Sequence, residues 1–226
     1  VDYSQIEMRI MAHASKDAAL IEAFSSGHDF HSATAARVFG VSPEAVTPGQ
    51  RAKVKAMNYG LAYGLSAFGL SSQLGIPTSE ARGLMEEYFE SFGHARAYLD
   101  GLVAEARKTG YTETLLGRRR YLPDLTSSNR QRREMAERMA LNAPIQGSAA
   151  DIIKLAMLDV EAGLAQAGLA SRMLLQVHDE LVFEVAPGER EALETLVRDR
   201  MGHAMDLLVP LDVSVGVGRS WHDAAH

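Results

Sequence analysis

The sequence contains no cysteine, which excludes disulfides and thiolate metal sites and fits a protein of the reducing cytoplasm. It lacks any stretch near the roughly 20 apolar residues that a membrane-spanning helix needs, and it lacks a basic-then-apolar signal peptide. Internal repeats and low-complexity linkers are absent as well. With 226 residues, of which 46% are hydrophobic, the chain is long enough to bury a sizeable core. We therefore expect a globular cytoplasmic protein that makes no contact with a membrane.

Basic residues are outnumbered, since 23 Lys and Arg stand against 29 Asp and Glu, for a net charge of −6. A protein that binds nucleic acid usually carries a basic face, so this balance argues against one. The distribution is uneven, however, because residues 107–138 hold nine basic and four acidic residues. This segment carries +5 and the rest of the chain −11. Its Arg118, Arg119 and Arg120 beside Tyr121 suit a phosphate backbone, although a run of charge is more often a solvated face.

The hydrophobic pattern predicts a mainly helical α+β protein. Helices are expected over about 4–14, 17–25, 30–39, 50–63, 66–74, 78–92, 94–109, 131–163 and 188–207. Proline removes a helix hydrogen bond, so the helix over 131–163 should bend or break near Pro144. Strands should be few: a stub at the start, a small hairpin across 111–121, a pair around Asp179, and 211–217, where apolar and polar residues alternate.

Arg51, Lys55, Tyr59 and Tyr63 recur every four residues in the predicted helix over 50–63. Each step rotates about 40° around a helix, so the four side chains share one stripe about 120° wide. Like charges one turn apart repel, and cations oppose the positive end of the helix dipole, so an anion is expected at the basic end. A polyphosphate with a flat base attached suits both halves of the stripe. A solvated basic turn followed by core tyrosines explains the pattern equally well.

Acidic residues occur at two distant places where a metal ion is expected. Apolar runs on either side of His178, Asp179 and Glu180 predict a β-hairpin with carboxylates at its turn. Adjacent carboxylates repel unless a cation neutralises them, and a single divalent metal ion would neutralise both charges. Asp2 stands where a short extended start gives way to a helical pattern. Taken alone, such a residue is more often a helix cap than a ligand.

Five ordered segments of the chain resemble those of family A DNA polymerases, the bacterial DNA polymerase I type. Asp2-Tyr3-Ser4-Gln5-Ile6-Glu7 resembles the family's first carboxylate motif, Arg51-x3-Lys55-x7-Tyr63-Gly64 its nucleotide-binding helix, and Val177-His178-Asp179-Glu180 its second carboxylate motif. TLLGRRRYLPDL at 114–125 and ERMALNAPIQGSAADIIK at 137–154 also match family segments. The resemblance runs from the first residue to the last, and five motifs in order are far more specific than any one of them.

The resemblance implies template-directed DNA synthesis, in which nucleotidyl transfer joins a dNTP to a primer 3′-hydroxyl. Two Mg²⁺ ions, with Mn²⁺ as a substitute, would lie roughly 3.5 to 4 Å apart and bridge the attacking and leaving oxygens. Asp2 and Asp179 are the candidate ligands, Tyr3 would add a backbone carbonyl, and Glu180 would support the site. The two aspartates are 177 residues apart, so only a fold that places the first strand beside the hairpin brings them together.

The family's nucleotide-binding positions correspond to Gln5, Glu7, His31, Arg51, Lys55, Tyr59 and Tyr63. Arg51 and Lys55 would hold the triphosphate, and Lys55 would also take part in catalysis. His31 would add a phosphate contact. Glu7 would block the ribose 2′-hydroxyl, and Tyr63 would lie by the templating position. Tyr59 stands where many members have phenylalanine, and its hydroxyl near the sugar 3′ position predicts weak rejection of chain-terminating nucleotides. Taken alone, a histidine is more often a cap or surface residue, and Glu7 an exposed acid of a first helical turn.

The implied DNA-binding set is Arg118, Arg119, Arg138, Asn142, Gln146 and His178. Its members at 138, 142 and 146 step by four residues and share one helical face. They would read minor-groove acceptors of primer and template, which are nearly the same for every base pair. Asn142 and Gln146 would equally serve to cap or stabilise a kink around Pro144.

The family fold implied is a small antiparallel palm sheet backed by helices, with an inserted, mainly helical fingers lobe. We expect palm at 1–29, fingers at 30–110 and palm again at 111–226. In the family a thumb, the first part of the palm and an exonuclease-like domain precede this point. The chain is therefore expected to be a C-terminal piece of a longer, monomeric, nucleoid-associated bacterial enzyme, and alone it should bind DNA weakly.

Other interpretations stay open. A binding fragment that has lost catalysis would have no chemical need for intact Asp2, Asp179, Arg51 and Lys55. A two-metal nuclease would share the carboxylates but would have no use for a triphosphate-binding stripe. Tight magnesium-dependent binding of nucleoside triphosphates would separate a polymerase from a nuclease. An RNA-making relative is less expected while Glu7 is present.

Overall fold

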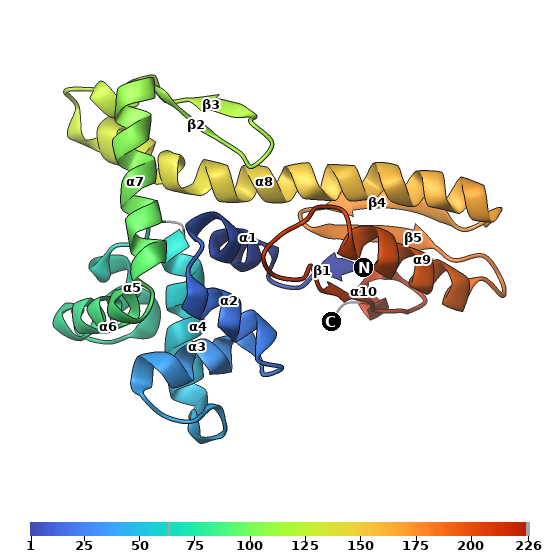
Figure 1. Ribbon diagram of the computed structural model, residues 1–226, viewed down its shortest axis with the longest axis horizontal. Helices are drawn as coiled ribbons and strands as arrows, with labels where there is room; N and C mark the ends of the chain where they lie inside the picture. Colours follow the sequence, from blue (N-terminus) through green and yellow to red (C-terminus); the bar gives the residue numbers. More distant parts are fainter. Residues whose placement is uncertain (63, 225–226) are drawn as a thin grey trace. The chain divides into compact units, whose positions relative to one another are not determined.

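The structure is a computed structural model that describes residues 1–62 and 64–224. The chain divides into two compact units, one of Val1–Ile6 with Ala149–His226 and one of Glu7–Ser148. Helices predominate and the strands form two small antiparallel sheets, which confirms the predicted α+β class (Figure 1). The borders of palm and fingers at residues 30 and 110 remain predictions, because compact units are not functional lobes.

The first unit is built on a four-stranded antiparallel sheet in the order β4-β5-β1-β6. Its strands are β1 (Asp2–Tyr3), β4 (Arg172–Val177), β5 (Glu180–Glu184) and β6 (Val213–Ser214). β1 is an inner strand, since Asp2 pairs with Glu180 on one side and with Ser214 on the other. Neighbouring residues of a strand point to opposite faces. Tyr3 faces the core, where only 2% of it is exposed.

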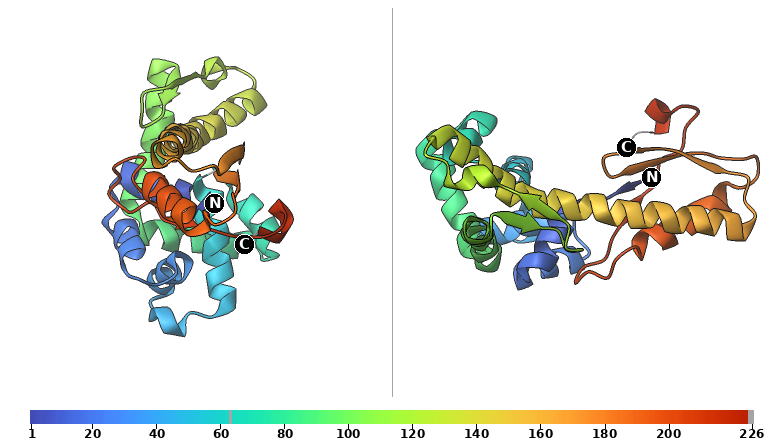
Figure 2. Two further views of the ribbon diagram at one scale, coloured as in Figure 1. Left: turned by 90° about the vertical axis from the view of Figure 1, so that its right-hand side faces the viewer. Right: turned by 90° about the horizontal axis from the view of Figure 1, so that it is seen from above.

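Two helices run beside this sheet (Figure 2). The part of α8 (Arg130–Ala167) that belongs to this unit packs on α9 (Arg190–Gly202), where a Cβ added to Gly163 would lie 3.3 Å from the Leu196 side chain. The Tyr3 hydroxyl donates to the Met201 carbonyl at 2.9 Å and so joins β1 to the end of α9. The chain then passes β6 and reaches the short helix α10 (Trp221–Ala224). The buried apolar residues of α8 and α9 in this unit are Ile152, Ile153, Ala156, Val160, Leu164, Leu193, Val197 and Met201.

The second unit is mainly helical. Its helices are α1 (Ile6–Ser15), α2 (Ala18–Ser25), α3 (Phe30–Phe39), α4 (Pro48–Ala62), α5 (Ala67–Leu74), α6 (Thr78–Ser91), α7 (Gly93–Thr109) and the first part of α8. Single turns of 3₁₀ helix occur at Pro43–Ala45 and Pro123–Thr126. A hairpin of β2 (Tyr111–Glu113) and β3 (Arg119–Tyr121) forms the second sheet. Among the described residues, no helix combines the length and apolar character that crossing a bilayer requires.

A buried carboxylate joins two helices of this unit. Asp17 is the N-cap of α2 and accepts hydrogen bonds from the backbone N–H groups of Ala19 at 3.1 Å and Leu20 at 3.2 Å. It also accepts from His94 and Ala95, at 3.1 Å each, at the start of α7. The first N–H groups of a helix have no partner within the helix. One side chain therefore satisfies backbone donors at two helix N-termini.

Two details of the predicted elements are corrected by the structure. The predicted break at Pro144 is wrong, because α8 is one helix from Arg130 to Ala167. Proline removes a single backbone donor, the one that would have bonded the Ala140 carbonyl, and the hydrogen bonds of the turns on either side are enough for the helix to continue. The strand predicted over 211–217 is present only as β6, Val213–Ser214.

Candidate active site

The first unit brings the two predicted carboxylate motifs to neighbouring strands. Asp2 pairs with Glu180 across β1 and β5, and the Tyr3 N–H donates to the Asp179 carbonyl at 3.2 Å. The adjacency required by the sequence argument, with the first strand beside the hairpin, is therefore confirmed. The backbone ladder fixes this register and so holds residues from distant parts of the chain close together.

The electrostatic environment of Asp179 disfavours its charge. Burial raises the pKa of the Asp179 carboxyl, and the negative charges of Asp2 and Glu180 raise it further. Its own backbone N–H and nearby His178 act in the opposite direction. A cation at this place would relieve the repulsion, because an opposite charge within a few ångströms favours the ionised form of a carboxyl.

The hairpin turn between β4 and β5 consists of two residues, His178 and Asp179. His178 has a positive φ of 54° and an exposed side chain, and its carbonyl accepts from Gln176 Nε2 at 2.6 Å. Two-residue hairpins need left-handed backbone, and histidine adopts it more readily than most residues. Gln5, directly after β1, also has a positive φ, of 58°. Two predicted site residues of this unit thus adopt a backbone conformation that is uncommon outside glycine.

The basic end of the predicted stripe lies in the second unit on α4 and already has an anionic partner. Arg51 donates to both carboxylate oxygens of Asp29, from Nε at 2.8 Å and from Nη2 at 3.0 Å. Despite partial burial, hydrogen bonds from Arg51 and Ser32 lower the pKa of Asp29 to about 2. The anion that the sequence argument expected near Arg51 is therefore supplied in part by the chain itself. Lys55, one turn further on, is exposed and has no hydrogen-bond or ion-pair partner within the described residues.

His31 is neither the helix cap nor the surface residue that a lone histidine usually is. The cap of α3 is Asp29, whereas His31 is 2% exposed. Its ring lies 5.6 Å from the Tyr59 ring, measured between centroids, so α3 presents His31 beside the aromatic half of the stripe. Burial lowers the pKa of His31 to about 4, with Asp29 opposing this shift and Arg51 and Lys55 adding to it. The imidazole is therefore neutral near pH 7.

Glu7 and Tyr63 are two further members of the predicted nucleotide-binding set. Glu7 lies in the first turn of α1 and is half-buried. Tyr63 lies outside the described residues.

The predicted DNA-binding residues of the second unit lie on α8 and on the hairpin before it. Arg138 and Gln146 on α8 are exposed, while Asn142 is half-buried. Arg118 donates from Nη2 to the Gly147 carbonyl at 3.0 Å, which places the hairpin loop against the same part of α8. Arg119 pairs with Glu113 at 2.6 Å and stacks over Tyr111. The Oδ1 atom of Asn142 is buried, and within the described part of the chain it has no hydrogen-bond partner.

The model of DNA polymerase family A matches residues 1–223. This chain belongs to DNA polymerase family A.

Individual relatives agree with this membership. DNA polymerase I of Mycobacterium leprae is 67% identical over 225 residues, which cover 100% of this chain and 25% of that protein. DNA polymerase I of Bacillus subtilis is 52% identical over 223 residues, 99% of this chain and 25% of that protein. The chain thus spans about a quarter of the length of these relatives.

A solved structure has the same fold. It is the POL domain of Pol1 from M. smegmatis in complex with DNA primer-template and dNTP, with a TM-score of 0.95 and 66% sequence identity. The match covers 100% of this chain and 40% of that one.

Sequence reasoning missed three polar residues of this family A chain. Asp29, which pairs with Arg51, is 22 residues away from it, and no local pattern links the two. Asn58 and Tyr88, which form a buried network with His31, were not singled out from the sequence. For Asn58 a signal was available, since a polar amide stands between the apolar Met57 and the aromatic Tyr59 in a predicted helix.

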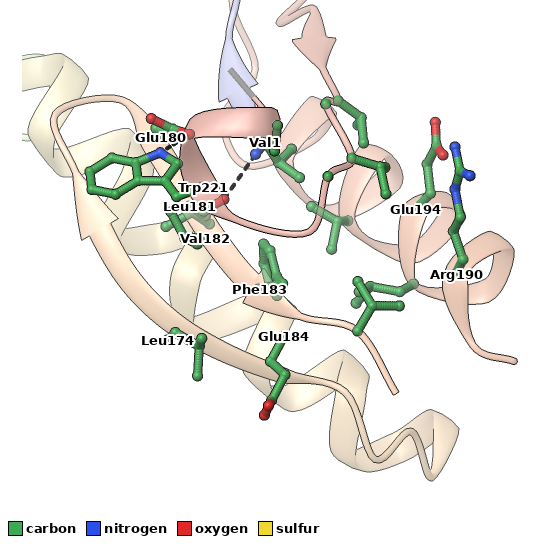
Figure 3. A pocket seen from close by; sticks show the side chains of 18 of the residues that line it. Val1, Leu174, Glu180, Leu181, Val182, Phe183, Glu184, Arg190, Glu194 and Trp221 are labelled. Atoms are coloured by element: carbon green, nitrogen blue, oxygen red, sulfur yellow. Dashed lines mark hydrogen bonds between the residues drawn. The ribbon is translucent and has the colours of Figure 1, made fainter. Parts of the chain in front are cut away.

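A pocket of about 520 Å³ in the first unit is not lined by Asp2 or Asp179. Of the predicted catalytic residues, only Glu180 lines it within the described chain. Figure 3 shows Glu180 at its edge, where the Trp221 indole N–H donates to Glu180 Oε1 at 2.8 Å. The wall is mostly apolar and includes Phe183 and Val197. Its chemistry does not suit a triphosphate, so we assign the candidate site to the aspartates instead.

Proposed function

We propose that this chain carries the polymerase site of a DNA polymerase I type enzyme, which extends a primer 3′-hydroxyl with dNTPs on a DNA template. The observation that carries the proposal is the placement of Asp2 and Asp179 on adjoining backbone of one small sheet, 177 residues apart in the chain. The solved relative bound to DNA primer-template and dNTP supports the same substrates here. We further propose a monomer that acts on DNA in the bacterial cytoplasm, at the nucleoid.

The donor set around these aspartates fits divalent metal ions. Two carboxylates and a backbone carbonyl are hard oxygen ligands, which Mg²⁺ prefers, and Mg²⁺ usually keeps several waters or substrate oxygens in its shell. No group of three or more acidic, histidine or cysteine side chains able to hold a metal occurs within the described residues. Asp2, Asp179 and the Tyr3 carbonyl would hold two Mg²⁺ or Mn²⁺ ions, which when bound would stabilise charge on the attacking and leaving oxygens.

The second unit would supply the groups that bind the incoming nucleotide. Lys55 is exposed at the basic end of α4 and would pair with the triphosphate as a mobile point charge. Arg51 would share its guanidinium between Asp29 and a phosphate, since five N–H donors exceed the two that Asp29 accepts. Neutral His31 would donate a hydrogen bond to a phosphate oxygen.

The selectivity of the site is assigned by position in the family motif. Glu7 would exclude the ribose 2′-hydroxyl, and Gln5 belongs to the same motif. Tyr59 would lie near the sugar 3′ position and weaken the rejection of chain terminators. Tyr63 would lie by the templating base.

The exposed residues of α8 and its hairpin would bind primer and template. Arg138 and Gln146 are exposed along one face of α8, and Asn142 lies between them with a buried Oδ1 atom. Arg118 would contact the backbone of the DNA, as would Arg119 if it exchanged its pairing with Glu113 for a phosphate. His178 at the exposed hairpin turn would contact the primer end beside Asp179.

Primer extension with the full-length protein tests the proposal. Asp179→Asn keeps the size of the side chain and removes its charge, so we expect extension to fall by at least about 100-fold, the scale of a lost electrostatic contribution to catalysis. Asp206→Asn is the matched control, because Asp206 is an exposed carboxylate of the same unit. Extension with dNTPs should greatly exceed extension with ribonucleotides. Undiminished synthesis by Asp179→Asn would sink the proposal.

A further inference from the structure

A buried polar network joins α3, α4 and α6 of the second unit. Asn58 Nδ2 lies 3.0 Å from His31 Nδ1 and 3.2 Å from Thr34 Oγ1. The Tyr88 hydroxyl lies 2.8 Å from Asn58 Oδ1. All four residues are at most 3% exposed. Buried polar groups of this kind are costly unless their donors and acceptors match.

The positions of the protons in this network follow from one backbone carbonyl. Thr34 Oγ1 lies 2.9 Å from the Phe30 carbonyl, which can only accept. The single hydroxyl proton of Thr34 is thereby used, so its oxygen must accept from Asn58. Asn58 must then turn its NH₂ group toward Thr34 and its carbonyl oxygen toward the Tyr88 hydroxyl, which donates to it.

The orientation of Asn58 determines which nitrogen of His31 carries the proton. The same NH₂ group that faces Thr34 also faces His31 Nδ1, so Nδ1 must accept a hydrogen bond. In a neutral imidazole one nitrogen accepts and the other donates, and the partner of one nitrogen therefore sets the role of the other. The proton of His31 must lie on Nε2.

We propose that Asn58 and Tyr88 are positioning residues that lock His31 as the Nε2–H tautomer, so that its imidazole presents a hydrogen-bond donor to an oxygen of the incoming nucleotide's phosphates. This inference rests on the proposed function for its ligand and on the network alone for its tautomer. Neither Asn58 nor Tyr88 touches the nucleotide in this scheme. The energetic advantage is that the donor is fixed before the nucleotide arrives, so binding does not have to select one of two tautomers.

The tautomer is measured by ¹⁵N NMR of the full-length protein labelled at the histidine rings, with the His31 signals identified by their loss in His31→Gln. We expect an unprotonated Nδ1 and a protonated Nε2 in the wild type. Asn58→Asp replaces the NH₂ donor by an acceptor and should move the proton to Nδ1. Tyr88→Phe keeps the ring that packs on Phe92, at 4.7 Å between centroids, and removes only the donor to Asn58. Asn58 is then oriented by its Thr34 contact alone, so the lock should weaken and a second population protonated on Nδ1 should appear beside the first.

Steady-state kinetics supply the second readout. Tyr88→Phe should raise the KM for dNTP about 5- to 10-fold, the worth of one hydrogen bond, with little change in kcat. Tyr98→Phe on α7 is the control and should change neither the tautomer nor KM. A wild-type His31 that is protonated on Nδ1, or a Tyr88→Phe protein with unchanged tautomer and KM, would overturn the inference. An NMR result as expected in a protein that fails to extend primers would overturn the proposed function and leave the tautomer lock supported.

Discussion

At the scale of the residue, Asp29 and His31 lie two positions apart and both have lowered pKa values, for different physical reasons. Burial lowers the pKa of His31 to about 4, because the charged imidazolium is poorly solvated inside the unit. Asp29 is partly buried too, which by itself raises its pKa, but hydrogen bonds from Arg51 and Ser32 outweigh this and lower it to about 2. Near neutral pH the pair thus comprises a neutral imidazole and an ionised carboxylate.

These two groups predict how stability depends on pH. Between pH 6.5, the ordinary pKa of histidine, and about pH 4 the unfolded chain binds a proton at position 31 that the folded chain excludes. The stability present above pH 6.5 should therefore decline as the pH falls toward about 4, by at most about 3 kcal/mol. The contribution of Asp29 is present above its ordinary pKa of 3.8 and is lost as the pH falls through about 2.

Urea unfolding of the wild type and of His31→Gln across this range measures the effect. The variant should lose less stability than the wild type between about pH 6.5 and about pH 4. His28→Gln, at an exposed histidine just before α3, should follow the wild type. Parallel curves for wild type and His31→Gln would show that burial of His31 does not control its protonation.

At the scale of the element, the contact between the β2-β3 hairpin and α8 depends on a residue without a side chain. A Cβ at Gly147 of α8 would lie 2.6 Å from Thr114 Cγ2 and 3.3 Å from Arg118 Nη2. Alanine within a helix normally stabilises by about 0.5–1 kcal/mol relative to glycine. At Gly147 the steric clash should reverse the sign, so that Gly147→Ala destabilises by about 1–3 kcal/mol.

Thermal or urea unfolding of the Gly147→Ala protein tests this packing. Gly83→Ala on α6 is the matched control, because no atom lies within 4 Å of its added Cβ and the helix gain should appear there unopposed. Adding Thr114→Ser to Gly147→Ala removes the clashing methyl while keeping a hydroxyl that accepts from the Arg118 N–H. Stability should return in the double variant. Equal effects at Gly83 and Gly147 would mean that the hairpin does not approach α8 this closely.

The elements were largely predictable from sequence because their signals are local. Apolar periodicity located α1–α7 and α9, and the hairpin of β4 and β5 followed from two apolar runs around a polar turn. Pro144 misled the prediction because one lost donor does not end a helix whose other hydrogen bonds remain. The paired aspartates were found through their motifs, whereas the partners Asp29–Arg51 and Asn58–Tyr88 were not, because contacts across 22 and 30 residues depend on how helices pack.

At the scale of the whole molecule, the basic segment 107–138 carries +5 in a chain of net charge −6. If this segment binds a phosphate backbone, its cations displace counterions, and the affinity falls with salt. Arg138 is exposed on α8 and is the most suitable single residue of this segment for testing whether it binds DNA. Arg138→Ala should reduce the slope of log affinity against log salt by about 0.9.

Fluorescence anisotropy of the full-length protein on a primer-template, over a series of salt concentrations, measures this slope. Arg96→Ala on α7 lies outside the basic segment, is exposed, and should leave the slope unchanged. A slope that is the same for Arg138→Ala and the wild type would place the DNA elsewhere.

β1 is two residues long, yet it fixes the position of Asp2, a proposed metal ligand. A sheet strand alternates its faces, so a shift of one position along the ladder would move Tyr3 out of the core and carry Asp2 to the opposite face of the sheet. The Tyr3 ring is buried in the core, and its hydroxyl donates to the Met201 carbonyl. Together these two interactions favour a single register of the strand. The geometry of the proposed reacting centre is thus held by an aromatic residue whose side chain lies on the other face of the strand.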